Sequence, residues 1–457
     1  MSMLTVRNPA SDATVAELPQ DDAQSIAAKY SAARAAQPAW AATPLQARFD
    51  TLRSFRDALT ADVERLAIIL TSETGKPIRQ SRNEIEGLPA RIDFFLAETE
   101  KTIAARDVHN AGGMREQISH EPLGVIANIS AWNYPYFVGG NVFVPALLTG
   151  NAVLYKPSEF AALTGLEIGK RMQTCGVPAD VFSVVIGDGA AGAELIKQPI
   201  DGVFFTGSYA TGERIARELG PRMVKLQLEL GGKDPIYVRE DVDVPNAAAS
   251  LADGAMYNTG QSCCSVERIY VHQTIYEDFV NAFRKEVAGF NRGDPAADDT
   301  YIGPLTRAPQ IEVLEKQVAD ALAKGAKLVL GGARVPLPGN WFAPTVLTHV
   351  NHSMDVMREE SFGPIIGIQK VANDEEAVRL MNDTEYGLTA GVYTTNEQRA
   401  KSILSQLRVG SVYWNCCDRV SPRLPWSGVG HSGVGLTLST YGIEAFTRPK
   451  AWHLKYA

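Results

Sequence analysis

The chain has 457 residues, which is too long for one ordinary hydrophobic core and predicts two or three domains. Because 45% of the residues are hydrophobic, large cores can form and wholesale disorder is excluded. The 44 Lys and Arg against 52 Asp and Glu leave a formal charge of −8, which disfavours nucleic acids and anionic membranes as partners. No apolar run reaches the roughly 18 residues of a membrane span, and the first residues do not resemble a signal peptide.

The first 100 residues are predicted to be mostly α-helix. Apolar residues recur at helical spacing over 21–40 and 45–77, and Gly75 and Pro77 end the second run. From Val125 onward, short β-branched runs alternate with helical ones. The strand candidates are 125–130, 152–156, 182–187, 202–208 and 223–230, with helices over 163–176 and 210–220. This alternation predicts βαβ units on a parallel sheet.

A second alternating series begins near residue 232 and predicts a second α/β domain. Its strand candidates are 234–238, 267–273, 327–332, 365–370 and 390–395, and its helix candidates are 246–260 and 274–290. The last stretch, 442–457, is strand-like and has two alternative partners, another subunit or its own chain.

The cysteines do not form a disulfide pattern. They are Cys175, Cys263, Cys264, Cys416 and Cys417, an odd number that includes two adjacent pairs with poor geometry for a bridge. We therefore expect a reducing, cytoplasmic location. The seven histidines are scattered, and neither H-E-x-x-H nor C-x-x-C occurs, so no metal site is expected.

Three short stretches contain residues suited to catalysis. Cys263, in GQSCC, is a candidate nucleophile, although by itself a buried structural cysteine is the better interpretation. Glu229, in LELGGKDP, lies in an apolar strand end, where a carboxylate is costly unless its pKa is raised or it is functional. Asn133, in ISAWNYP, follows a strand at the sheet edge where ligands bind in open α/β folds, but it also suits an ordinary turn.

Two further stretches suit a dinucleotide. In FFTGSYATG a strand leads into a turn at Gly207 and a helix near Gly212, whose backbone N–H groups can hold a pyrophosphate. In YKPSE, Lys156 and Glu159 follow a strand and can grip ribose hydroxyls. The alternative for both stretches is a solvated loop.

Together these stretches resemble the aldehyde dehydrogenase superfamily, whose NAD(P)-dependent members oxidise aldehydes to acids. The matching motifs are WNYP (132–135), KPSE (156–159), FTGS (205–208), LELGG (228–232), GQSC (260–263), EESFGP (359–364), PWSG (425–428) and SGVG (432–435). They follow the family's order through nearly the whole chain. The resemblance implies an α/β fold with a Rossmann-type cofactor domain (1–103 and 123–231), an α/β catalytic domain (232–431) and a small oligomerisation hairpin, with oligomerisation segments at 104–122 and 444–457.

The resemblance also assigns roles to residues. Cys263 would be the nucleophile, Glu229 the general base, and Asn133 with the Cys263 backbone N–H the oxyanion hole, while Cys264 would be a bystander. The expected cofactor is NAD, with NADP as the alternative. Its expected binding residues are Trp132, Lys156, Ser158, Glu159, Gly207, Ser208, Gly212, Leu230, Glu360 and Phe362. The expected partners are a small-molecule aldehyde and a second copy of the chain, in a homodimer or homotetramer.

This chain departs from the family pattern at three positions. Val142 and Thr437 stand where many members carry the lysine and glutamate credited with relaying a proton from the base. Glu229 would therefore deprotonate through water. Asn141 stands where succinate-semialdehyde dehydrogenases often place an arginine, which weakens a carboxylate-semialdehyde interpretation.

Four residues bear on the aldehyde tail. Tyr134 and Trp426 match aminoaldehyde-oxidising relatives and predict an aromatic entrance, which can hold a cation. Arg419 and Arg423 precede Trp426 and favour an anion if they point inward, although solvated loop positions suit them equally well. Two other functions stay open at this point. One is a cysteine-dependent hydrolase or acyltransferase, and the other is a non-catalytic relative that acts as a binding protein.

Overall fold

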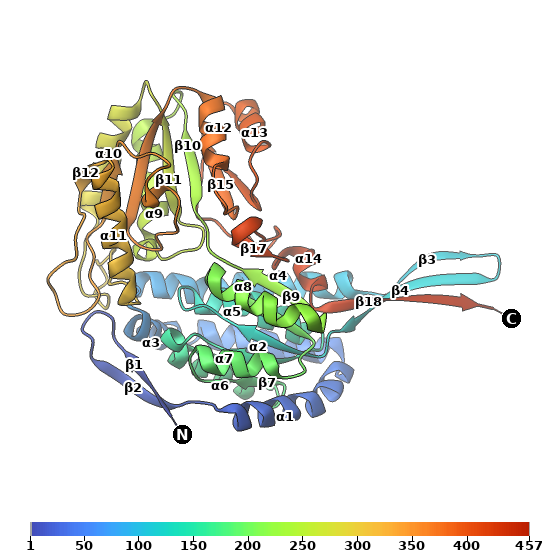
Figure 1. The fold of residues 1–457 in the computed structure, drawn as a ribbon. Helices are drawn as coiled ribbons and strands as arrows, with labels where there is room; N and C mark the ends of the chain where they lie inside the picture. The colour runs from blue at the N-terminus through green and yellow to red at the C-terminus, as the bar shows by residue number, and fades with distance from the viewer. Residues whose placement is uncertain (1, 457) are drawn as a thin grey trace.

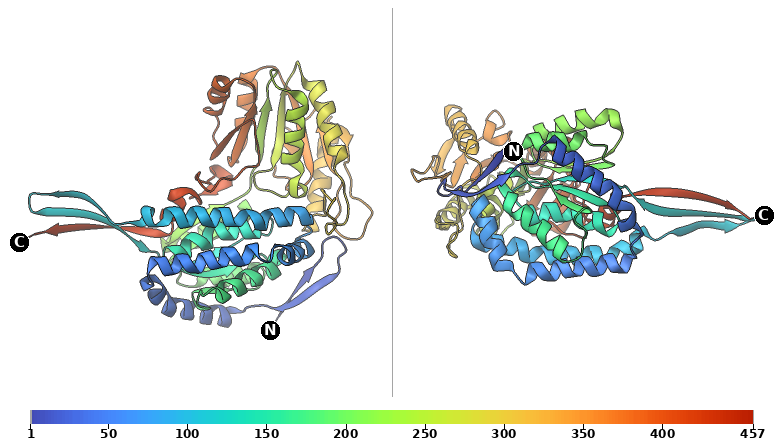
Figure 2. Two further views of the ribbon diagram at one scale, coloured as in Figure 1. Left: turned by 180° about the vertical axis from the view of Figure 1, so that it is seen from behind. Right: turned by 90° about the horizontal axis from the view of Figure 1, so that it is seen from below.

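The computed structural model describes residues 2–456 as two α/β lobes with an arm that projects from the first (Figures 1 and 2). A six-stranded sheet in the order β17-β9-β8-β5-β6-β7 forms the first lobe. A seven-stranded sheet in the order β12-β13-β14-β11-β10-β15-β16 forms the second. The arm is a three-stranded antiparallel sheet, β18-β4-β3, which extends away from the body in every view.

The first lobe and the arm combine both ends of the chain. Their strands are β1 (Met3–Arg7), β2 (Thr14–Pro19), β3 (Arg106–Ala111), β4 (Met114–Pro122), β5 (Val125–Ile129), β6 (Ala152–Lys156), β7 (Phe182–Val184), β8 (Gly202–Thr206), β9 (Lys225–Glu229), β17 (Gly433–Val434) and β18 (Thr447–Lys455). Their helices are α1 (Ala23–Ala42), α2 (Leu45–Thr60), α3 (Val63–Thr74), α4 (Ile78–Ile103), α5 (Pro135–Leu148), α6 (Ala162–Thr174), α7 (Gly189–Lys197), α8 (Tyr209–Leu219) and α14 (Ser439–Glu444).

The second lobe is continuous in sequence. It contains β10 (Asp234–Val238), α9 (Val244–Met256), β11 (Val266–His272), α10 (Tyr276–Gly289), α11 (Pro309–Ala323), β12 (Lys327–Leu330), β13 (Thr345–Thr348), β14 (Ile365–Val371), α12 (Asp374–Asn382), β15 (Thr389–Tyr393), α13 (Glu397–Leu404) and β16 (Ser411–Trp414). Short 3₁₀ turns lie at Glu159–Ala161, Gly220–Arg222, Tyr257–Gly260, Asp355–Met357 and Gly430–Ser432.

The structure differs from the predicted elements near the N-terminus and settles the pairing of the C-terminal strand within the chain. The N-terminus forms the β1–β2 hairpin, which the prediction of mostly helix overlooked. The single run over 45–77 is two helices, α2 and α3, and α3 ends at Gly75 with a left-handed φ of 75°. Of the two partners considered for the C-terminal strand, the structure pairs β18 with β4 of the same chain, from Thr447 opposite Pro122 to Lys455 opposite Met114.

Helix α5 forms the centre of the first lobe. Nearly all of its residues are buried, and it packs on β5 and β6 from one side and on α2 and α4 from the other. A helix that is apolar all round must be enclosed in this way. A Cβ on Gly140 of α5 would lie 2.7 Å from Leu88 Cδ1 of α4, so glycine allows these two helices to approach closely.

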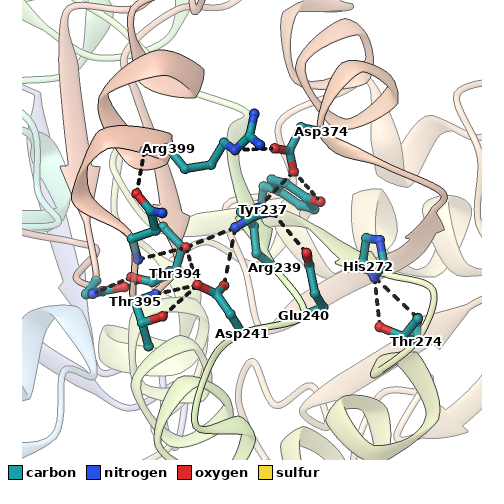
Figure 3. A network of polar contacts seen from close by, with 12 residues as sticks. Tyr237, Arg239, Glu240, Asp241, His272, Thr274, Asp374, Thr394, Thr395 and Arg399 are labelled. Carbon is teal, nitrogen blue, oxygen red and sulfur yellow. Dashed lines mark hydrogen bonds and ion pairs between the residues drawn. The ribbon is translucent and has the colours of Figure 1, made fainter.

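The carboxyl ends of the strands in the second sheet are tied together by polar side chains (Figure 3). Arg239, which follows β10, pairs with Asp374 at the start of α12 (2.9 Å). Asp241 accepts hydrogen bonds from the hydroxyls of Thr394 (2.8 Å) and Thr395 (2.7 Å), which follow β15. The side chains at this end of the strands therefore bond to one another, whereas Cys263 precedes β11 and lies at the opposite end of the strands.

Candidate active site

Cys263 lies in a strained loop between α9 and β11, at the amino edge of the second sheet. Asn258, Thr259 and Gly260 all have left-handed φ values, of 52°, 58° and 70°. Such a conformation is unusual for a β-branched residue, and strain of this kind clusters at functional sites. A Cβ on Gly260 would lie 2.3 Å from the carbonyl oxygen of Gly363, so only glycine fits there. The half-buried Cys263 lines a cavity of about 530 Å³.

Glu229 ends β9 and lines the same cavity. The segment after β9 and the loop of Cys263 meet closely, because a Cβ on Gly232 would lie 2.5 Å from the carbonyl oxygen of Cys263. Burial raises the pKa of Glu229 to about 7, opposed by a hydrogen bond that the hydroxyl of Thr437 donates to its carboxylate. A carboxyl group with this pKa can exchange protons with water near neutral pH, as a general base must.

Asn133 follows β5 and is fixed against the cysteine loop. Its Nδ2 donates to the carbonyl oxygen of Gln261 (3.2 Å), and Asn258 Nδ2 donates to the carbonyl oxygen of Asn133 (3.2 Å). A buried ion pair between Glu84 and Lys76 fixes the start of α5, because Glu84 also accepts the backbone N–H of Tyr136 (2.9 Å). The oxyanion-hole candidate is therefore held on both sides.

Cys264 differs sharply from its neighbour. It is buried, and its thiol donates to Asp418 Oδ1 (3.0 Å). Its hydrogen bond with Cys263, its burial and the charge of Asp418 raise its pKa well above the usual value. This sulfur is held as a thiol, which is a poor nucleophile.

A second cavity of about 520 Å³ runs along the carboxyl edge of the first sheet. Six of the expected cofactor residues line it, namely Trp132, Lys156, Ser158, Glu159, Gly207 and Ser208. Ser208 is the N-cap of α8 but makes no capping bond, so the first N–H groups of the helix are free for an anion. A Cβ on Gly207 would lie 2.5 Å from the ring of Phe205, so a larger residue at this turn would displace that ring. These features fit a dinucleotide.

The other four expected cofactor residues lie beside this cavity and do not line it. A Cβ on Gly212 would lie 2.6 Å from Leu230 Cδ2, so these two residues pack α8 on the end of β9. Glu360 accepts the backbone N–H of Gly232 (3.0 Å), and burial followed by the charge of Glu267 raises its pKa to about 8. The Phe362 ring contacts Trp132 edge-on, with 5.6 Å between ring centroids.

The structure brings three of the four expected substrate residues to the cavity at Cys263. Tyr134, Trp426 and Arg419 line it. Trp426 is buried, whereas Arg419 is largely exposed. Arg423 is exposed and lies outside the lining of this cavity.

Comparison with known proteins agrees with this geometry. A family model described as the aldehyde dehydrogenase family matches residues 2–452. The chain belongs to this family. It is 36% identical to 3,6-anhydro-alpha-L-galactose dehydrogenase of Streptomyces coelicolor, over 99% of this chain and 93% of that protein.

Two solved structures extend the comparison. A 3,6-anhydro-L-galactose dehydrogenase in complex with NADP is 32% identical, with a TM-score of 0.95 over 99% of this chain and 96% of the other. PnpE in complex with nicotinamide adenine dinucleotide is 31% identical, with a TM-score of 0.96 over 99% and 94%.

These matches confirm the fold class, the family and the activity that the sequence predicted. The chain is an NAD(P)-dependent aldehyde dehydrogenase that oxidises an aldehyde to an acid. Within residues 2–456, no helix has the length and apolar character to cross a membrane. The same residues contain no group of three or more His, Cys, Asp or Glu placed to hold a metal ion.

Sequence reasoning missed several residues of this aldehyde dehydrogenase's site. Arg91 of α4 lines the cavity at Cys263 yet is buried, with 7% of its surface exposed. Lys233 forms a buried ion pair with Glu267 (2.6 Å), and Glu267 also accepts the N–H of Phe362 (3.0 Å). The signal available for Arg91 was its place on the apolar face of a helix, next to Leu88 and Ile92, where an arginine is unusual.

Proposed function

We propose that this aldehyde dehydrogenase oxidises a neutral, hydroxylated aldehyde of the sugar type, with NAD as its preferred cofactor. The observation that carries the substrate class is the mixed charge of the cavity at Cys263. The first lobe contributes Arg91, Glu229 and Glu84, the last of which is paired with Lys76, and the second contributes Asp253, Asp418 and Arg419. An aldehyde tail that carries a net charge would be repelled by the side chains of the same sign in this cavity. Hydroxyls can both donate to the carboxylates and accept from the arginines. The two 3,6-anhydrogalactose dehydrogenases among the relatives support this class.

The catalytic roles follow from the placement of three side chains. The thiolate of Cys263 attacks the aldehyde carbon, and the developing oxyanion is held by Asn133 and the Cys263 backbone N–H. Glu229 then takes a proton from the water that hydrolyses the thioester. Its raised pKa suits this step, because water is a weak acid and a base with a higher pKa accepts its proton more readily.

The dinucleotide would lie along the 520 Å³ groove. When bound, its nicotinamide accepts the hydride that leaves the substrate carbon. Lys156 and Glu159 would hold the adenosine ribose, and the start of α8 with Gly207 and Ser208 would hold the pyrophosphate, since all four residues line the groove. Glu159 would repel a 2′-phosphate, which favours NAD, although Lys197 and Arg214 also line the groove and keep the preference modest.

Two coarser expectations complete the proposal. The chain would form a homodimer or homotetramer through the β18-β4-β3 arm, because the arm extends from the body and exposes Val108, Trp452 and Tyr456. It would work in a reducing, cytoplasmic compartment, since the five cysteines are free thiols.

The test is a steady-state comparison of aldehydes at 340 nm. The panel is 3,6-anhydro-L-galactose, 3,4-dihydroxybutanal, butanal, succinate semialdehyde and 4-aminobutanal, each with NAD and with NADP. We expect the two hydroxylated aldehydes to give the highest kcat/KM, and NAD to exceed NADP. A higher kcat/KM for either charged aldehyde or for butanal would overturn the substrate class.

A further inference from the structure

One face of α4 forms a wall of the cavity that holds Cys263. Gln80, Asn83, Glu84, Gly87 and Arg91 line it, at helical spacing from one turn to the next. Close packing fixes this wall against α5, because a Cβ on Gly87 would lie 2.7 Å from the ring of Phe137. The position of α4, and so of Arg91, is therefore set by the core of the first lobe.

Arg91 is buried with few partners. Its Nη1 donates to Asn141 Oδ1 (2.8 Å), and its guanidinium carbon lies 3.9 Å from the centroid of the Phe137 ring. Within residues 2–456, no carboxylate lies within ion-pair distance of the Arg91 guanidinium. The bond to Asn141 is the only hydrogen bond that the Arg91 side chain makes to these residues. A guanidinium has five N–H donors, so donors remain for a molecule in the cavity.

Burial of a charge with so little compensation is expensive for a protein. Desolvation lowers the pKa of Arg91 to about 10, opposed by the charges of Glu84 and Glu229, so the side chain stays protonated at neutral pH. An occupant of the cavity that carries a hydrogen-bond acceptor would offset this cost.

The structure also answers a question that the sequence left open. Asn141 of α5 lines the same cavity, and its side chain accepts from Arg91. The guanidinium of Arg91 therefore reaches the part of the cavity beside Asn141 from α4. The sequence comparison alone, made at position 141, finds no basic group there.

We propose that Arg91 is a specificity-determining residue, whose free N–H groups bind a hydroxyl or ring oxygen in the tail of the aldehyde. This deepens the function proposed above and rests on it for the choice of a neutral hydroxylated tail. Asn141 orients the guanidinium, and the Phe137 ring supports its face. Arg91 acts on the tail of the substrate and takes no part in the chemical steps at the aldehyde carbon.

The experiment compares 3,4-dihydroxybutanal with butanal, which differ only in two hydroxyls, in wild type and in Arg91→Met. The readout is the ratio of the two kcat/KM values. We expect the ratio to fall about 10- to 100-fold, mostly through KM of the hydroxylated aldehyde, because a charge-assisted hydrogen bond is lost. Removing the Arg91 charge also raises the pKa of Glu229, but this affects both aldehydes alike and cancels in the ratio.

Arg79→Met is the matched control, since Arg79 lies on the same helix but is exposed and outside the cavity lining. Its ratio should stay within about twofold of wild type. If Arg91→Met does not fold, Arg91→Lys keeps the charge and loses the planar fork, and its ratio should still fall, by roughly threefold or more.

An unchanged ratio in a folded Arg91 variant, or an equal loss with both aldehydes, would overturn the role of Arg91. The failure of the proposed substrate class is distinguishable from this result. It would show as a wild-type preference for butanal or for a charged aldehyde, whatever the Arg91 variants do to the ratio.

Discussion

The two neighbouring cysteines are expected to have opposite importance. Cys263 faces the cavity, whereas Cys264 is buried and its thiol bonds to Asp418. Cys263→Ala should lower kcat by roughly 10³-fold or more, because the neighbouring thiol of Cys264 is buried and bonded to Asp418 and cannot replace it. Cys264→Ala should retain most of the activity, and both variants should bind NAD as the wild type does. Dehydrogenase assays measure the activities, and titration of NAD followed by tryptophan fluorescence measures binding. Activity in Cys263→Ala and its loss in Cys264→Ala would reject Cys263 as the nucleophile.

Thr437 is expected to set the pH at which Glu229 works. Its hydroxyl bonds the Glu229 carboxylate and so favours the charged form, against the burial that raises the pKa to about 7. In Thr437→Val this bond is lost and the pKa rises further, so the base is ionised only at higher pH. A hydrogen bond to a charged group corresponds to about 1–2 pH units.

The measurement is the rate of acyl-enzyme hydrolysis against pH. In Thr437→Val, the ascending limb of the pH profile should shift to higher pH by that amount. Thr437→Ser keeps the hydroxyl and should give the wild-type profile. The same limb in all three proteins would mean that Thr437 does not act on the base.

At the scale of elements, the contact between α4 and α5 positions the site. Gly140 of α5 lies against Leu88 of α4, and Arg91 meets Asn141 one helical turn farther along α4. Gly140→Val would insert two methyl groups and a Cβ that starts 2.7 Å from Leu88 Cδ1. Overpacking of this kind should lower the free energy of unfolding by about 1–3 kcal/mol.

Urea denaturation measures this loss. Gly289→Val at the exposed end of α10 is the control, because a Cβ there meets no atom within 4 Å, and it should change stability by less than about 0.5–1 kcal/mol. Equal losses in the two variants would show that helix propensity, and not the α4–α5 contact, determines the effect.

The sequence predicts elements best where the signal is local. Lys156 and Glu229 end short apolar strands, and Asn133 and Gly207 follow such strands. The structure places all four strands in one sheet. The β1–β2 hairpin escaped prediction because little of either strand is buried, so neither strand shows a continuous apolar run.

Arg91 escaped prediction for a different reason. On an amphipathic helix an arginine is ordinarily solvated, and only the position of α5 and of the second lobe encloses it. Arg423 is the opposite case. Its position in the loop before Trp426 made it a candidate substrate residue, but its side chain is exposed. Local patterns place residues on elements, but the direction of a side chain depends on what packs against it.

At the scale of the molecule, the site exists only where the lobes meet. Glu229 and Asn133 come from the carboxyl edge of the first sheet, and Cys263 from the amino edge of the second. The chain returns to the first lobe after β16, where Gly433 of β17 pairs with Glu229 and Thr437 reaches its carboxylate. The late motifs thus support a base that lies more than 200 residues earlier in the sequence.

The arm supplies the prediction that belongs to the assembled protein. Its outer strands β18 and β3 are edge strands. Trp452 of β18 and Val108, at a register shift in β3, are exposed, as is Tyr456, which follows β18. An exposed strand edge with apolar side chains is a template for a second chain. Wild type should therefore sediment as a dimer or tetramer, and the double variant Trp452→Asp, Val108→Asp should sediment as a monomer with an unchanged far-UV spectrum. Trp452→Phe should keep the assembly, and a monomeric wild type or an intact oligomer in the double variant would exclude the arm as the interface.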